Sequence, residues 1–339
     1  MFASKPGRAL AFACSFTFCL LAAGALAITL LGRPHHAAIT LDLRETGSKS
    51  RIAAPAPPPV EGAAIGSVTK PVYAGKALLA DPALIENTAQ GPLPRIADDG
   101  RKPMTAYAAP AASGKFKIAI VVSGLGLSAS ATRAALDALP SGVTLGFAPY
   151  AGDVGAWAAQ ARSRGHEILL EIPMEPFDFP DSDPGPHTLR SGSDEDANVQ
   201  RLTWALTRFT GYAGVTNLLG QRFLSDTEAL APTLTNLGRR GLYFFDNGSA
   251  AQSVAPTVAG QVGLPLAQAS TTIDTIQTAL EIDRRLVELE NQARANGSAV
   301  GAAFLYPVSI ARIAAWAKSL QSRGFVLVPV SAIVTAQKQ

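Results

Sequence analysis

The stretch Ile118-Ala119-Ile120-Val121-Val122-Ser123-Gly124-Leu125-Gly126 decides the fold. Its five leading apolar residues predict a short buried strand, and the glycines that follow predict a turn. Residues 129–139 come next and carry apolar side chains at helical spacing. Strand, turn and helix in this order form a unit that the rest of the chain repeats.

Alternating apolar runs and helical stretches continue to the end of the chain. The predicted strands are Ile118–Val122, Val143–Phe147, Glu167–Ile172, Gly214–Thr216, Leu242–Phe245, Pro265–Ala269, Ala299–Phe304 and Phe325–Val330. The predicted helices are Ala129–Leu139, Val154–Arg164, Asp194–Phe209, Thr227–Arg239, Ile273–Ala295 and Ile310–Ser322. Such alternation is typical of a parallel sheet with helical crossovers. Residues 115–339 are therefore expected to form an α/β domain, an irregular (β/α)7–8 barrel.

The N-terminal region predicts a membrane segment. Residues 9–32 contain no charged side chain, and Lys5 and Arg8 precede them. About 20 apolar residues cross a bilayer, and flanking positive charge stays in the cytoplasm. We therefore expect a cytoplasmic N-terminus over 1–8, an inner-membrane anchor over 9–32 and a periplasmic C-terminal domain. The alternative is a signal peptide cleaved after Ala25-Leu26-Ala27, which would secrete the domain to the periplasm.

Residues 33–114 are rich in Ala and Pro, as in Ala53-Ala54-Pro55-Ala56-Pro57-Pro58-Pro59, and predict a disordered linker. Both cysteines, Cys14 and Cys19, precede this linker, so a disulfide or a cysteine-based zinc site is excluded downstream. The net charge of +3 is small and scattered, which argues against a nucleic-acid partner.

Chemistry in a parallel barrel takes place at the C-terminal ends of its strands. By this rule Glu175 and Asp246 are candidate catalytic residues. Glu175 could instead hold a loop or pair with an Arg, and Asp246 could form a structural ion pair with Arg222. The candidate glycan-binding residues by the same rule are Ser123, His187, Asn217, Arg222 and Tyr306. His166 precedes its strand, so we expect it on the opposite face.

Several motifs in this domain resemble those of the divergent polysaccharide deacetylase family. They are residues 118–126, Ile172-Pro173-Met174-Glu175-Pro176, Asp183-Pro184-Gly185-Pro186, residues 214–223, Phe245-Asp246-Asn247 and Val328-Pro329-Val330-Ser331. The resemblance covers nearly all of residues 117–335. It implies the irregular βα barrel of the glycoside hydrolase and deacetylase type, and an action on acetylated glycans.

Active members of the family use a divalent metal such as zinc, held by Asp and His. At the positions of these ligands the chain has Ser123, Gly124, Leu218 and Phe304. A catalytic zinc needs about three protein ligands. The resemblance therefore implies a pseudoenzyme with a decayed metal site and without a metal cofactor.

We consider three functions from the sequence. The first is a membrane-anchored envelope protein that binds or processes a cell-envelope glycan after the loss of its metal site. The second is an active glycan deacetylase with a different set of ligands. The third is an envelope scaffold without catalysis.

Overall fold

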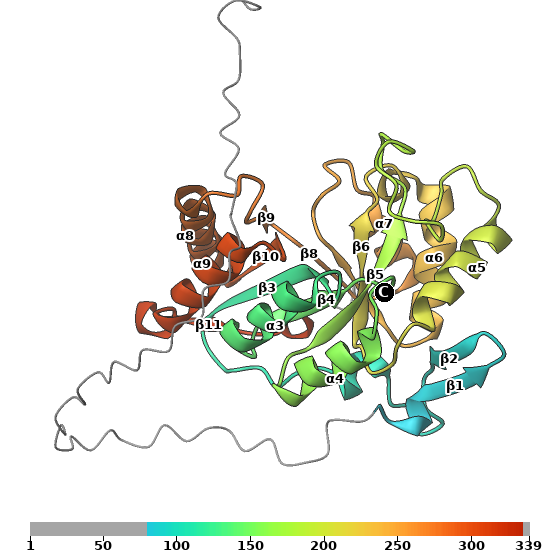
Figure 1. The fold of residues 1–339 in the computed structure, drawn as a ribbon, viewed down its shortest axis with the longest axis horizontal. Helices are drawn as coiled ribbons and strands as arrows, with labels where there is room; N and C mark the ends of the chain where they lie inside the picture. The colour runs from blue at the N-terminus through green and yellow to red at the C-terminus, as the bar shows by residue number, and fades with distance from the viewer. Residues whose placement is uncertain (1–79, 335–339) are drawn as a thin grey trace, which may run out of the picture. The chain divides into compact units, whose positions relative to one another are not determined.

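The computed structural model describes residues 80–334, and its central feature is a curled sheet of parallel strands (Figure 1). The sheet contains nine strands: β3 (Phe116–Leu125), β4 (Thr144–Phe147), β5 (Ile168–Met174), β6 (Gly214–Leu219), β7 (Tyr243–Asp246), β8 (Leu266–Gln268), β9 (Thr271–Thr272), β10 (Ser298–Phe304) and β11 (Phe325–Leu327). Their order is β8-β7-β6-β5-β4-β3-β10-β9, and β11 pairs with β3. The prediction of an α/β fold with a curled parallel sheet is confirmed, and all eight predicted strands are present.

The chain between β8 and β9 bridges the two edges of this sheet. β8 pairs with β7, and β9 pairs with β10. In the two residues between them, the N–H of Ala269 donates to Asp246 and the N–H of Ser270 donates to Val300. The sequence predicts one strand over 265–269 here and misses β9, because a bend separates two very short pairings.

Helices flank the sheet on its outer side. They are α3 (Ala129–Ala138), α4 (Val154–Ser163), α5 (Glu195–Leu206), α6 (Thr227–Arg239), α7 (Ala255–Val262), α8 (Ala279–Asn296) and α9 (Pro307–Lys318). In Figure 1, α8 and α9 lie on one side of the sheet and α5 and α6 on the other. The sequence analysis missed α7 and placed the start of α8 at Ile273, six residues too early.

Alternate residues of each strand face inward or outward. Outward residues such as Ile118, Ile120 and Leu170 pack beneath the helices in one core cluster. Inward residues such as Val121 and Leu169 form a second, smaller cluster inside the curled sheet. The two clusters cover the two faces of the sheet, so neither face is exposed to solvent, as is typical of parallel sheets.

The N-terminal side of the sheet is covered by segments from both ends of the described chain. A hairpin of β1 (Ile85–Thr88) and β2 (Gly91–Pro94), together with α2 (Pro103–Ala106), precedes the sheet. Leu84 and Tyr107 are buried within the inner cluster, as are Val328 and Val330 after β11. The predicted disordered linker over 33–114 is therefore wrong for residues 80–114. Scattered apolar residues in this Pro-rich segment gain burial by packing on the domain, which local composition does not reveal.

Among the residues that the structure describes, no helix is both long and apolar enough to span a bilayer. The predicted membrane segment over 9–32 lies outside those residues.

Candidate functional site

The four positions where the family resemblance expects metal ligands lie at the C-terminal edge of the sheet. Ser123 of β3 stands beside Phe304 of β10 in the strand register, and Leu218 of β6 stands beside Pro173 of β5. Gly124 has a φ of 89°, a conformation that side chains other than glycine rarely adopt. Leu and Phe side chains have no donor atom for a metal. The residues present therefore do not fit a zinc centre of the family type.

Residues 80–334 hold no group of three His, Cys, Asp or Glu side chains that could bind a metal ion together. Of their two histidines, His166 lies at the opposite face as predicted, with Nδ1 2.8 Å from the carbonyl oxygen of Val143. Burial lowers the pKa of His166.

Glu171 on β5 is a buried acidic residue close to this edge, and it is not among the residues predicted from the sequence. Its side chain is fully buried, and its Oε1 accepts a hydrogen bond from the N–H of Gly124. Burial raises the pKa of the Glu171 carboxyl to about 8. A Cβ built on Gly146 of the neighbouring strand would lie 3.1 Å from both Glu171 Oε1 and Ser123 Oγ, so these groups share one crowded space that glycine keeps open.

The second oxygen of Glu171 and the hydroxyl of Thr216 lack hydrogen-bond partners within the described part of the chain. The two residues face each other in the register of β5 and β6. Unpaired buried polar groups cost free energy, and each of them calls for a partner such as a bound water, an ion or a ligand. A charged residue inside the apolar run Ile168-Leu169-Leu170-Glu171-Ile172 is the signal that could have identified this position.

Glu175 connects two loops at the same edge. Its Oε2 accepts the N–H of Ser191 at 2.8 Å, and its Oε1 lies 3.6 Å from Nη1 of Arg222. The backbone oxygen of Glu175 also accepts from the N–H groups of Arg222 and Phe223, each at 3.1 Å. Glu175 thus anchors the loop after β5 to the segment after β6. Arg222 pairs with Glu175, so the considered pairing of Arg222 with Asp246 is wrong.

Asp246 is buried and engaged with its neighbours. Its Oδ2 accepts from Nε2 of Gln268 at 2.8 Å, and its Oδ1 accepts from the N–H of Gly248 at 3.0 Å. Both oxygens therefore support the turn after β7 and its contact with β8. This arrangement argues against Asp246 as a catalytic acid or base.

Asn217 belongs to a pair of amides that ties two loops together. Its Nδ2 donates to Oδ1 of Asn247 at 2.9 Å, and its Oδ1 accepts the N–H of Asn247 at 3.0 Å. Nδ2 of Asn247 donates in turn to the backbone oxygen of Asn217. Asn217 therefore holds the end of β6 against the turn after β7.

His187 lies on the ring of Trp204 of α5, with ring centroids 3.7 Å apart and planes 9° apart. The backbone N–H of His187 donates to the hydroxyl of Tyr150. Burial, followed by the charges of Arg208 and Arg201, lowers the pKa of His187. The imidazole thus packs on α5 and fixes the long loop between β5 and α5 to that helix.

Tyr306 follows β10 and is partly exposed, with its ring centroid 6.2 Å from that of Phe304. Ser123 lies two residues before the end of β3, and Arg222 and Tyr306 follow β6 and β10 at the same edge. Of the five predicted glycan-binding residues, Arg222 and Tyr306 are exposed and His187 is partly buried, whereas Ser123 and Asn217 are buried.

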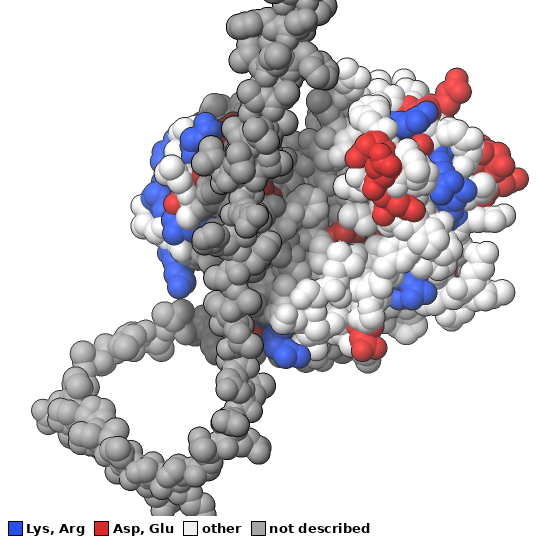
Figure 2. Space-filling view, turned by 45° about the horizontal axis from the view of Figure 1, so that its top comes forward, with Lys and Arg blue, Asp and Glu red and all other residues white. Residues whose placement is uncertain are grey.

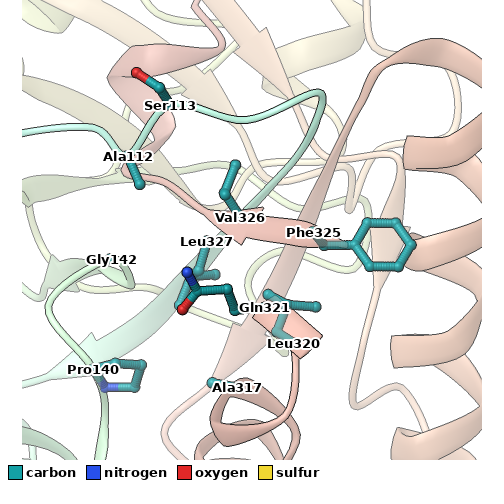
Figure 3. A pocket seen from close by; sticks show the side chains of 10 residues that line it. All are labelled: Ala112, Ser113, Pro140, Gly142, Ala317, Leu320, Gln321, Phe325, Val326 and Leu327. Carbon is teal, nitrogen blue, oxygen red and sulfur yellow. The ribbon is translucent and has the colours of Figure 1, made fainter. Parts of the chain in front are cut away.

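A hollow of about 290 Å³ at the opposite end of the sheet contrasts with this edge (Figure 3). It lies beside β11 and is lined mainly by apolar residues, including Pro140, Leu320, Phe325 and Leu327. Because the hollow lies at the N-terminal side, it contains none of the candidate residues.

Comparison with known proteins places this geometry among relatives. A family model described as divergent polysaccharide deacetylase matches residues 120–334. YibQ of Escherichia coli K12, an uncharacterized protein, is 24% identical over 208 residues, which are 61% of this chain and 63% of YibQ. The chain thus spans less than two thirds of that relative. An uncharacterized protein of Haemophilus influenzae is 25% identical over 204 residues, 60% of this chain and 72% of its own length.

A solved structure provides a further match. The crystal structure of the uncharacterized protein ATU2773 from Agrobacterium tumefaciens C58 is 43% identical in sequence. It superimposes with a TM-score of 0.71, covering 72% of this chain and 100% of that structure.

Proposed function

Since the chain belongs to the divergent polysaccharide deacetylase family, we propose that it binds a cell-envelope glycan without metal-dependent hydrolysis. One observation carries this proposal. The four positions expected to hold the metal contain Ser123, Gly124, Leu218 and Phe304 at the C-terminal edge of the sheet. Three protein ligands are the usual minimum for a catalytic zinc, and these side chains do not supply them.

The edge keeps features that suit binding rather than bond cleavage. The two carboxylates expected to catalyse, Glu175 and Asp246, serve as anchors for loops. Such anchoring gives rigid loops, and rigid loops lower the entropy that a ligand loses on binding. Arg222 and Tyr306 remain exposed at this edge.

The direct test is the release of acetate from acetylated glycans by the purified full chain. We expect no release above background from N-acetylglucosamine oligomers, while a pull-down with envelope polysaccharide retains the chain. An active polysaccharide deacetylase assayed in parallel serves as the control. Acetate release that a chelator abolishes would contradict the proposal.

A second candidate function is a deacetylase with a different set of ligands. The observation that favours it is the unpaired oxygen of Glu171 beside the unpaired hydroxyl of Thr216. The same acetate assay on Glu171→Gln separates the two candidates. Activity in the wild type that this variant loses would support the hydrolase and overturn the binding function.

The envelope location is part of the proposal. It is supported by the uncharged run over 9–32 and by Lys5 and Arg8 before it. Alkaline phosphatase fused after residue 339 should be active, since this enzyme requires an oxidising compartment. Activity of a cytoplasmic reporter at the same site, with an inactive phosphatase fusion, would contradict the location.

A further inference from the structure

A groove of about 570 Å³ lies between the loop after β5 and the first turn of α6. Its lining includes Phe177, Ser191, Arg222, Asp226, Thr227 and Glu228. A smaller hollow of about 160 Å³ shares Ser191 and Glu228 with it and continues between α5 and α6. The two hollows are neighbours on one surface, and an extended ligand could contact both.

Phe177 forms an aromatic platform in this groove. Its side chain is 64% exposed, although burial of a Phe is worth roughly 1.5–3 kcal/mol. The loop that carries it is held firmly, because the backbone groups of Glu175 and Leu189 pair and Glu175 accepts from Ser191. The exposed ring on this anchored loop is accessible for stacking against a ligand. A sugar ring presents an apolar face of C–H groups that can stack on such a ring.

Polar groups around Phe177 supply both donors and acceptors. The side chain of Arg222 is 54% exposed, and its contact with Glu175 at 3.6 Å leaves its N–H groups available to the groove. Oδ1 of Asp226 caps the start of α6 by accepting the N–H groups of Glu228 and Ala229, which leaves Oδ2 as an acceptor. The carboxylate of Glu228, on the exposed first turn of α6, is a further acceptor in the groove. Alternating donors and acceptors match a ligand rich in hydroxyl groups.

The charge of the surroundings restricts the class of glycan. Residues 176–196 contain six carboxylates and one arginine, and Asp226 and Glu228 add two more carboxylates in the groove. The six are Asp178, Asp181, Asp183, Asp194, Glu195 and Asp196. Figure 2 shows acidic side chains, with several basic ones between them, on the side of the molecule where α5 and α6 lie. Such a field attracts cations and repels polyanions before contact.

We propose that this groove binds an amino-sugar polymer with free, protonated amino groups, stacked on Phe177 and held by Arg222, Asp226 and Glu228. The inference rests on the proposed glycan-binding function and names the class of glycan. An N-acetylated polymer could stack on Phe177 as well, but it lacks the cationic groups that the carboxylates favour. An acidic polysaccharide is disfavoured by the same carboxylates.

Calorimetric titration of the purified full chain tests this inference with three hexasaccharides. They are glucosamine hexamer, N-acetylglucosamine hexamer and galacturonic acid hexamer. We expect the glucosamine hexamer to bind about tenfold more tightly than the acetylated one, and the acidic hexamer not to bind. Tighter binding of the acetylated or the acidic hexamer would overturn the inference.

Matched variants locate the binding site. Phe177→Ala should weaken binding of the glucosamine hexamer about tenfold. Leu127→Ala removes an equally exposed apolar side chain, 63% against 64%, from the loop after β3 and should leave binding unchanged. Glu228→Gln should weaken binding about threefold, whereas Asp153→Asn at the exposed start of α4 should have no effect. A thermal unfolding curve for each variant confirms that it is folded.

The outcomes separate this inference from the function beneath it. If Phe177→Ala binds the glycan as tightly as the wild type, the groove is not the binding site, and the proposed function is unaffected. Failure of all three hexamers and of envelope polysaccharide to bind would contradict both.

Discussion

Two glutamates in and beside β5 show how the two ends of the sheet differ. Glu167, the residue before β5, and Glu171 within the strand are both fully buried. Oε1 of Glu167 accepts from the hydroxyl of Tyr243 at 2.9 Å and from the N–H of Ser331 at 3.1 Å. The N–H of Ala109 and the hydroxyls of Ser331 and Thr144 also donate to Glu167. Glu171 accepts from Gly124, and its other oxygen is unpaired among the described residues.

This difference indicates that Glu167 stabilises the fold, whereas the surroundings of Glu171 are suited to function. Two partners of Glu167, Ala109 and Ser331, come from the segments that cover the N-terminal side of the sheet. The other two partners belong to the sheet itself, Tyr243 to β7 and Thr144 to β4. The carboxylate therefore stabilises the fold by joining distant parts of the chain. The surroundings of Glu171 leave polar groups unsatisfied, which a protein selected for stability alone would not retain. Function is thus expected at the end where Glu171 lies.

The largest expected effect comes from the same substitution at the two glutamates. Glu167→Gln places an amide N–H₂ among groups that all donate, so buried donors lose their acceptor, at roughly 1–3 kcal/mol each. We expect a loss of about 3 kcal/mol in the free energy of unfolding, measured by urea denaturation. Glu171→Gln at pH 7 should cost less than about 1 kcal/mol, since one hydrogen bond is involved. Equal losses in the two variants would refute the division between the ends.

A second effect is the pH dependence that Glu171 contributes. Burial raises the pKa of this carboxyl to about 8 in the folded chain, from an ordinary value of 4.5. Between these two pH values the folded chain keeps a proton that the unfolded chain releases. The free energy of unfolding therefore falls as pH rises, by up to about 1.4 kcal/mol per pH unit.

Urea denaturation of the wild type and of Glu171→Gln at pH 5, 6, 7 and 8 measures this contribution. Other titrating groups are common to both proteins, so the difference between the two curves isolates Glu171. Wild-type stability should decline relative to the variant as pH increases. Parallel curves would show that the buried carboxyl does not titrate as described.

The anchor of the loop after β5 should give a smaller effect. Glu175→Gln weakens the hydrogen bond from Ser191 and removes the ion pair with the half-exposed Arg222, so we expect a loss of about 1 kcal/mol. Residues 176–193 should then be cleaved faster in limited proteolysis. Asp137→Asn, which breaks an exposed ion pair with Arg164, serves as the control and should change stability by less than about 0.5 kcal/mol. If residues 176–193 are cleaved at the same rate in Glu175→Gln as in the wild type, Glu175 does not anchor this loop.

Much of the fold follows from the sequence because the strand signals are local. The runs at 118–122 and 299–304 consist of apolar residues and glycine, and each is followed by a segment with apolar residues at helical spacing. Both runs form strands. The hairpin at 85–94 and the bend at 269–270 depend on packing with distant segments, so no local pattern predicts them.

The candidate site was only partly predictable for the same reason. The position rule for parallel strands correctly brought Ser123, Arg222 and Tyr306 to one edge. It could not tell that Asp246 is engaged with Gln268, or that His187 rests on Trp204, because these partners are distant in sequence. Glu171 is not predicted as a site residue because it lies within an otherwise apolar strand, Ile168–Ile172, and not after its end.

Calorimetric titration of the full chain with zinc tests the central claim, that the C-terminal edge no longer holds a metal, most directly. The claim predicts no stoichiometric binding, and therefore identical heats for the wild type and for Glu171→Gln. A single tight site in the wild type that Glu171→Gln or Ser123→Ala abolishes would contradict it.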